Sequence, residues 1–256
     1  MTIQLDDLHK SFGQKHVLRG FSLEVRDGET LTVLGPSGSG KSVMLKHIVG
    51  LLTPDRGQVL VDGQNVGELE MNDLYDLRRK VGYVFQLAAL FDSLSVADNV
   101  GLGLHRVGGF REDQIRERVR ECLHLVDLEG FEDRFPAELS GGQKKRAGLA
   151  RAIATKPKYL LYDEPTTGLD PLTKAVIDQL ILKMRQELGV TGLVITHDME
   201  SAYRVSDRIA MLYEGRRRFL GTPDEIRGTE DPVVRAFIEG DPQYLERRET
   251  TVEEAS

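Results

Sequence analysis

The sequence predicts an α/β fold: a core with a parallel sheet, a small antiparallel β layer and an inserted α-helical subdomain. Two patterns support this prediction. Short apolar runs typical of buried strands alternate with segments whose apolar residues recur at helical spacing. The opening segment instead alternates apolar and polar positions through Ile3, Leu5 and Leu8, and again through Phe21, Leu23 and Val25. Such alternation is typical of antiparallel strands with one face in the core.

The parallel strands are predicted where branched and aromatic residues form short runs between helical segments. These runs are residues 30–34, 59–61, 81–85, 159–162, 193–196 and 209–213. Helices are predicted at 43–52, 112–126 and 172–188, and the segment from about 87 to 157 is predicted as the helical subdomain. In the 112–126 helix, Cys122 shares an apolar face with Ile115 and Val119, so we expect a core residue rather than a nucleophile.

Composition bounds the class of protein. The 256 residues are 40% hydrophobic and 29% charged, which excludes wholesale disorder. The 34 basic and 41 acidic residues give a net charge of −7, which argues against a nucleic-acid partner. The single cysteine excludes an intrachain disulfide, and no apolar run approaches the roughly 20 residues of a spanning helix. We expect a cytosolic chain with one domain over 1–240 and an acidic, flexible tail over 241–256.

A glycine-rich loop follows the predicted strand at 30–34 and precedes a helix. It matches the G-x-x-x-x-G-K-S pattern of a P-loop NTPase core. Its backbone N–H groups would cradle phosphates, with Lys41 on the β and γ phosphates and the hydroxyl of Ser42 on Mg²⁺. The alternative, a glycine-rich turn without a ligand, fits this strand–helix context poorly. The predicted phosphate-binding residues are Gly35, Pro36, Ser37, Gly38, Ser39, Gly40, Lys41, Ser42 and Val43.

Two carboxylates follow the predicted strand at 159–162. Asp163 is placed to orient Mg²⁺, and Glu164 is placed to polarise an attacking water. Exposed carboxylates at strand ends are common singly, but this pair accompanies a P-loop. On these elements alone the chain could be a kinase, a GTPase or a motor.

The segment Leu139-Ser-Gly-Gly-Gln143 narrows the choice, because it resembles the signature motif of the ATP-binding cassette (ABC) ATPases. Other elements of that family occur in the same order along nearly the whole chain. They are an aromatic residue near the start, the Q-loop glutamine, the D-loop aspartate and the switch histidine, here Phe12, Gln86, Asp170 and His197.

The resemblance implies a role for each of these residues. Phe12 would stack on adenine, and Gln86 would reach Mg²⁺ and the attacking water. His197 would join Glu164 at the γ-phosphate, and Asp170 would lie at a dimer interface. In the family, one chain's signature closes over the ATP of another chain, which implies an ATP-dependent homodimer. The signature residues that would bind nucleotide are Ser140, Gly141, Gly142 and Gln143, at the N-terminus of a predicted helix.

ATP and Mg²⁺ are the implied cofactors. No cluster of cysteine and histidine has the spacing of a metal site. The remaining histidines have no comparable placement; they are His9, His16, His47, His105 and His124.

The segment 84–100, with its apolar residues after Gln86, is similar to that of the MCE-type phospholipid transport (Mla, maintenance of lipid asymmetry) ATPases. The segments 40–48, 162–171, 196–202 and 231–240 fit the same subfamily. Two departures are Gln143, where methionine is expected, and the basic run Arg216 to Arg218. This resemblance implies an integral membrane permease partner, with membrane-anchored lipid-binding and small accessory subunits as further candidates.

The resemblance also places the chain peripherally on the cytoplasmic face of the inner membrane. Alternative interpretations remain open: an ATPase of an amino-acid or other polar-solute importer, and, from another class, a soluble ABC ATPase without a transporter. A small-molecule kinase would not need the 139–143 segment.

Overall fold

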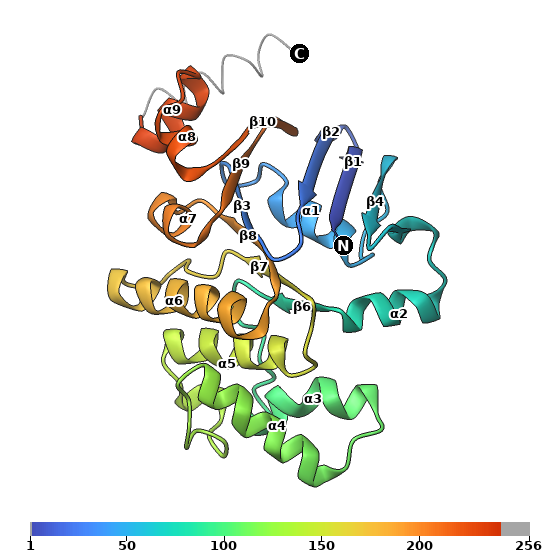
Figure 1. The fold of residues 1–256 in the computed structure, drawn as a ribbon, viewed down its shortest axis with the longest axis vertical. Coiled ribbons are helices and arrows are strands. Elements are labelled where there is room, and N and C mark those ends of the chain that lie inside the picture. The colour runs from blue at the N-terminus through green and yellow to red at the C-terminus, as the bar shows by residue number, and fades with distance from the viewer. Residues whose placement is uncertain (1, 242–256) are drawn as a thin grey trace.

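A six-stranded sheet runs through the middle of the computed structural model, which describes residues 2–241 (Figure 1). Its strand order is β10-β9-β3-β8-β7-β6, and all neighbours are parallel except β10 and β9. Every residue of β3, β7 and β8 is buried, as expected for parallel strands covered on both faces. The strands are β3 (Thr30–Leu34), β6 (Val81–Val84), β7 (Tyr159–Asp163), β8 (Thr191–Thr196), β9 (Arg208–Tyr213) and β10 (Arg216–Gly221).

A second sheet is antiparallel and has the order β2-β1-β4-β5. It confirms the predicted β layer, in which Leu5 lies opposite Leu23 on one side and Val59 on the other. Its strands are β1 (Ile3–Phe12), β2 (Lys15–Val25), β4 (Arg56–Val61) and β5 (Gln64–Asn65).

The placement of residues 59–61 in the parallel sheet was wrong. They belong to β4, which pairs antiparallel with β1. Val59 and Val61 are buried while Leu60 between them is less so, a period of two that fits a sheet with one covered face. Asp62 and Gly63 then have positive φ angles of 52° and 79°, which form the tight turn into β5.

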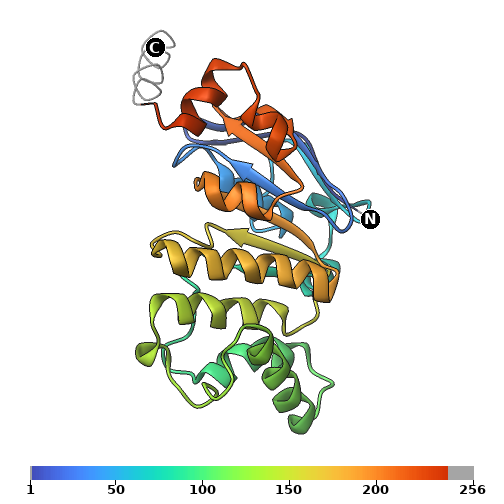
Figure 2. The same cartoon turned by 60° about the vertical axis from the view of Figure 1, so that its left-hand side comes forward.

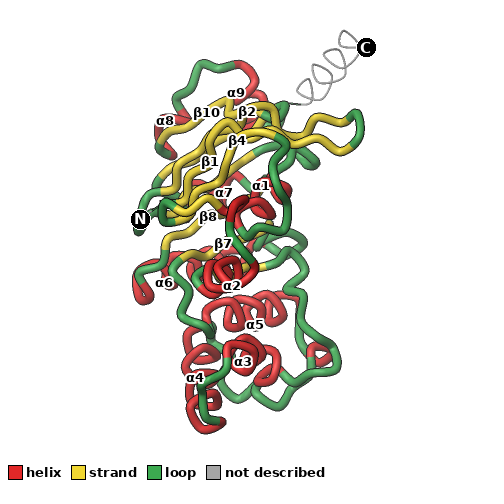
Figure 3. The backbone as a smooth tube through the Cα atoms, turned by 90° about the vertical axis from the view of Figure 1, so that its right-hand side faces the viewer, coloured by secondary structure: helices red, strands yellow, loops and turns green. Residues whose placement is uncertain are grey.

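Helix α1 (Lys41–Ile48) lies where both sheets contribute to one hydrophobic core (Figure 3). Its Met44, Leu45 and Ile48 are fully buried. They pack in one cluster with Phe21 of the antiparallel sheet and Leu161 of the parallel sheet. The helix that carries the P-loop lysine therefore has little freedom to move.

The predicted helical subdomain forms one end of the molecule, below α6 (Pro171–Leu188) in Figure 2. Side chains of its helices and of α6 share one core. Its elements are α3 (Val96–Val107), α4 (Glu112–Leu125), the 3₁₀ turn η2 (Pro136–Glu138) and α5 (Gly141–Ile153). The predicted helices at 112–126 and 172–188 correspond to α4 and α6.

The remaining elements flank the two sheets. A 3₁₀ turn η1 (Val66–Glu68) and α2 (Met71–Arg79) lead from β5 to β6, and α7 (Met199–Val205) leads from β8 to β9. Helices α8 (Pro223–Arg227) and α9 (Pro232–Glu239) close the described chain and pack against β9 and α7. Within residues 2–241, no helix combines the length and apolar character needed to cross a bilayer. Of the predicted tail, 242–256 lie outside the described residues.

Cys122 provides a chemical test of the core. Its side chain is fully buried, and burial raises the pKa of the thiol to about 11. Both effects suppress the reactive thiolate. We expect a disulfide reagent at about pH 8 to label the native protein at least ~100-fold more slowly than the urea-unfolded chain. Equal labelling rates in the native and unfolded protein would contradict the burial.

Candidate active site

The P-loop connects the end of β3 to the start of α1, as predicted. Gly40 precedes α1 with φ 105°, and a Cβ at this position would lie 2.8 Å from a methyl group of Val17. A Cβ at Gly35 would collide with the backbone carbonyl of Leu212. Glycine is therefore required at both ends of the loop by close packing against neighbouring strands.

Lys41 is the first residue of α1 and is 6% exposed. Its Nζ donates to the carbonyl oxygens of Gly35 (2.8 Å) and Pro36 (3.1 Å) and lies 3.5 Å from Oε1 of Glu164. Burial lowers the pKa of Lys41, and the nearby carboxylates of Glu164 and Asp163 oppose that effect. The loop thus holds a largely desolvated cation, which attracts phosphate strongly.

Asp163 ends β7 and receives two hydrogen bonds. Ser42 Oγ donates to its Oδ1 at 3.0 Å, and the hydroxyl of Tyr83 donates to its Oδ2 at 3.0 Å. Tyr83 lies on β6, and burial raises the pKa of its hydroxyl, which keeps it protonated as a donor. Sequence analysis missed Tyr83, because a tyrosine in a strand gives no local sign of the carboxylate on the next strand.

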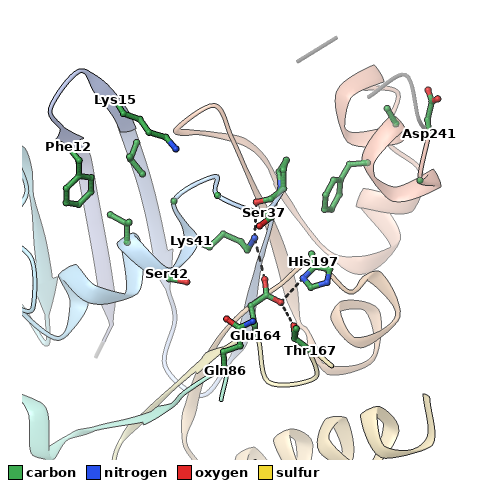
Figure 4. A pocket seen from close by; sticks show the side chains of 18 residues that line it. Phe12, Lys15, Ser37, Lys41, Ser42, Gln86, Glu164, Thr167, His197 and Asp241 are labelled. Atoms are coloured by element: carbon green, nitrogen blue, oxygen red, sulfur yellow. Dashed lines mark hydrogen bonds and ion pairs between the residues drawn. The ribbon is translucent and has the colours of Figure 1, made fainter. Parts of the chain in front are cut away.

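Glu164 follows Asp163 with a positive φ of 50°, an uncommon conformation for a residue with a Cβ. Its N–H donates to the carbonyl of Ile195 at 2.9 Å. Its Oε2 accepts from Thr167 Oγ1 at 3.0 Å and lies 2.8 Å from Nδ1 of His197 (Figure 4). The structure therefore brings Lys41, Glu164 and His197 together, from the P-loop and the ends of two different strands.

His197 is followed by a tightly bonded turn into α7. Asp198 caps α7 through the N–H of Ser201 (3.2 Å) and contacts Lys174 Nζ of α6 at 2.5 Å. Asp178 of α6 is fully buried; its Oδ2 accepts from Ser201 Oγ at 3.1 Å and from Arg204 at 2.5 Å. These contacts hold the segment after His197 against α6.

One pocket of about 980 Å³ collects most of the predicted residues (Figure 4). The predicted residues that line it are Phe12, Pro36, Ser37, Gly38, Gly40, Lys41, Ser42, Val43, Gln86, Glu164 and His197. Gly35 and Ser39 belong to the same loop, and Asp163 contacts Ser42 beside it. Sequence analysis missed the opposite wall, to which α9 contributes Ala236 and Phe237. A C-terminal helix carries no motif that would connect it with the loop.

The residues 140–143 do not line this pocket. They lie at the N-terminus of α5, where Ser140 Oγ accepts from the N–H of Gln143 (3.3 Å) and Gln143 Oε1 accepts from the N–H of Ser140 (2.8 Å). A Cβ at Gly142 would lie 2.5 Å from a methyl group of Thr173, so α5 and α6 begin side by side.

Asp170 caps the start of α6 by accepting from the N–H groups of Leu172 (3.1 Å) and Thr173 (3.0 Å). Its side chain is exposed. The starts of α5 and α6 therefore lie outside the pocket. The residues predicted to bind nucleotide thus form two separate groups in one chain: those at the pocket and residues 140–143.

The fold and this pocket define a P-loop protein of the ATP-binding cassette class. The family model described as ABC transporter matches residues 18–167, more than half of the chain. The chain therefore belongs to the ABC transporter family, and it is an ATP-hydrolysing cassette that binds ATP.

Two curated relatives illustrate the range of the family. The chain is 44% identical over 255 residues to "Protein TRIGALACTOSYLDIACYLGLYCEROL 3, chloroplastic" of Arabidopsis thaliana, with 93% of this chain and 73% of the relative covered. It is 40% identical over 240 residues to "Probable ribonucleotide transport ATP-binding protein mkl" of Mycobacterium leprae (strain TN), with 94% and 69% covered.

Solved structures agree with the fold. A dimeric post-hydrolysis state of the ATP-binding cassette MJ0796, bound to ADP and Pi, matches with a TM-score of 0.79 and 36% identity, covering 86% of this chain and 98% of that one. The cbiO1 protein of Clostridium perfringens, part of the cbiONQ transporter complex, matches with a TM-score of 0.82 and 31% identity, covering 98% of each chain.

The α6–α7 contact gives a pH-dependent prediction. Replacing Arg204→Ala leaves the buried carboxylate of Asp178 without its cation. Solvent screens the partly exposed Arg204, so we expect a cost of only about 2–3 kcal/mol near neutral pH. Burial already raises the pKa of Asp178, so the folded state binds a proton there more tightly than the unfolded chain. Arg204 lowers that pKa, so its removal raises the pKa of Asp178 further in the variant. Protonation of Asp178 then stabilises the variant more than the wild type, and the loss of stability shrinks as the pH falls.

Urea unfolding at about pH 7.5 and about pH 5.5 measures this effect. Arg116→Ala is the matched control, because it breaks an exposed pair with Glu112 and should cost less than about 0.5 kcal/mol. A loss for Arg204→Ala no larger than that of the control would contradict the buried pairing.

Proposed function

We propose that two copies of this cassette close around ATP and drive a membrane permease that moves phospholipid or another hydrophobic substrate. The observation on which this proposal rests is that the residues predicted to bind nucleotide form two separate groups within one chain. Lys41, Glu164 and His197 line the pocket, whereas residues 140–143 lie at another helix N-terminus outside it. A second copy related head to tail supplies the missing half at each pocket. The dimeric solved cassette with ADP and Pi supports this arrangement.

Within each pocket, Glu164 is the general base. Its carboxylate faces Lys41 and His197, so it can take a proton from water beside the terminal phosphate. Lys41 supplies positive charge to the phosphates, and His197 holds the Oε2 edge of Glu164. Phe12, 48% exposed at the other end of the pocket, offers its ring to adenine.

The donor set beside Lys41 fits Mg²⁺. The hydroxyl of Ser42 and the carboxylate of Asp163 are oxygen donors 3.0 Å apart, and Gln86 lines the same pocket. These residues would hold the ion, which when bound neutralises charge on the phosphates. Tyr83 holds the other oxygen of Asp163, so Oδ1 stays directed at Ser42, which lines the pocket.

The segment from Phe85 to Phe91, which includes Gln86, is the proposed permease contact. Phe85, Leu87 and Phe91 are large apolar side chains exposed there. The segment itself is held firmly: buried Asn99 bonds the N–H and carbonyl of Phe91, and Arg151 donates to the carbonyls of residues 88 and 89. A fixed loop with an apolar surface beside Gln86 can transmit closure of the site to a partner.

A lipid cargo is favoured by the local sequence of residues 84–100 and by the Arabidopsis relative, whose name contains that of a galactolipid. By this proposal residues 1–240 form one cassette on the cytoplasmic face of the inner membrane, attached peripherally through the permease. Membrane-anchored lipid-binding and small accessory subunits complete the proposed complex.

A polar solute is the second candidate cargo. The observation that favours it is the set of relatives named for polar substrates. These include the mycobacterial protein above and a sulfate/thiosulfate import protein of Caulobacter vibrioides, 42% identical over 243 residues, with 94% of this chain and 69% of the relative covered. The site geometry is common to both candidates, so cargo must be tested separately from hydrolysis.

Glu164→Gln tests the catalytic proposal. Removal of the general base should cut ATP turnover by about 10²–10⁴ while ATP binding persists. Light scattering with ATP and Mg²⁺ should then show a stable dimer. Lys41→Ala is the matched control, because it removes the phosphate contact and should weaken nucleotide binding as well. Near-normal turnover in Glu164→Gln would remove this residue from its role, and a monomer at saturating ATP would contradict the composite site.

Cargo can be tested by affinity purification of the tagged chain from detergent-solubilised membranes. We expect a permease and a membrane-anchored lipid-binding subunit to co-purify with bound phospholipid, identified by mass spectrometry. Added phospholipid should raise the ATP turnover of the purified complex, and sulfate or ribonucleotide should not. A complex that contains a periplasmic solute-binding protein and responds only to a polar solute would favour the second candidate.

A further inference from the structure

Helix α5 carries a buried lysine just after residues 140–143. Lys145 is 8% exposed, and its Nζ donates to the backbone carbonyl of Glu164 at 3.3 Å. Lys145 does not line the nucleotide pocket. The adjacent Lys144 is only half-buried. Lys145 of α5 therefore contacts the backbone of Glu164, the proposed general base, from a position outside the nucleotide pocket.

A buried ammonium at this position is costly for the fold. Burial lowers the pKa of Lys145, and only the charges of Glu164 and Asp163 oppose that effect. An aliphatic side chain of the same length would fill the space without the desolvation cost. The lysine is therefore poorly explained by packing, and its charge is directed at the two carboxylate residues of the site.

The contact acts on the backbone of Glu164. This residue has a φ of 50°, a left-handed backbone conformation that is uncommon for a residue with a Cβ. The N–H of Glu164 is held by the carbonyl of Ile195 on β8, and its carbonyl is held by Lys145 on α5. The two bonds lie on either side of the Cα, so together they set the direction in which the carboxylate points.

We propose that Lys145 is a positioning residue that couples segment 140–143 of a chain to Glu164 of the same chain. This inference rests on the proposed function, in which 140–143 bind the ATP of the partner copy. The five steps from the N-cap Ser140 to Lys145 rise about 7.5 Å along the helix. Binding of the partner's nucleotide at the helix start therefore displaces or fixes the carbonyl of Glu164, which links the two ATP sites of the dimer.

Lys145→Met tests the coupling in the full-length protein. We expect kcat for ATP to fall about 10- to 100-fold, as for loss of a charge-assisted hydrogen bond that orients a base. The ATP affinity of the isolated subunit should stay within about twofold, because Lys145 lies outside the pocket. We expect a Hill coefficient of turnover against ATP above one in the wild type, and this coefficient should fall toward one in the variant.

Two further variants separate coupling from structure. Lys145→Arg keeps a cationic donor and should recover part of kcat and of the Hill coefficient. Lys144→Met removes a neighbouring charge of the same helix and should behave as the wild type. Thermal unfolding should show Lys145→Met at least as stable as the wild type, because a buried charge has been removed.

The inference is overturned if kcat of Lys145→Met stays within about twofold of the wild type, or if Lys144→Met loses as much. A loss of kcat with an unchanged Hill coefficient would also overturn it, because the lysine would then act on its own site alone. Active Glu164→Gln would instead contradict the proposed function. Inactive Glu164→Gln together with fully active Lys145→Met would leave that function in place and remove only the coupling.

Discussion

The pairing of Lys41 with Glu164 across the pocket is the constraint on which the rest of the site depends. Lys41 Nζ lies 3.5 Å from Oε1 of Glu164, and both side chains are nearly buried. Lys41 is the first residue of α1, and Glu164 follows the end of β7. Charges in such a position are stable only when each is compensated. The loop carbonyls compensate the lysine, and Thr167 and His197 compensate the carboxylate. The charged groups of the site thus balance one another within the fold.

The geometry of that pair follows from the layers of the fold. Helix α1 is fixed by Met44 and Leu45 in a core shared by the two sheets, so Lys41 has one position relative to β7. The parallel order of β3, β8 and β7 brings the carboxyl ends of these strands to one edge. Residues that follow them, such as Glu164 and His197, therefore meet there.

The helical part makes the cassette asymmetric. Its α5 starts beside α6, away from the pocket, so within one chain the start of α5 is separated from the P-loop at the start of α1. At the same time α5 reaches back through Lys145 to Glu164. One helix thus connects residues 140–143, where we propose that the partner's nucleotide binds, with Glu164 of the same chain. The side-chain bonds between α6 and α7 hold the segment after His197 against α6, the helix that Asp170 caps.

The sequence by itself determined the features that depend on contiguous residues. The P-loop, the carboxylates after an apolar strand, the helix that follows Ser140, the helix predicted from about Leu172 and the alternation of β1 and β2 are local patterns, and each is found where it was predicted. Only the tertiary structure decided which distant segments meet. It placed Val59 in the antiparallel sheet, Tyr83 on Asp163, Lys145 on Glu164 and α9 on the pocket wall. Such contacts arise from packing between elements far apart in the chain, and no single stretch of sequence encodes them.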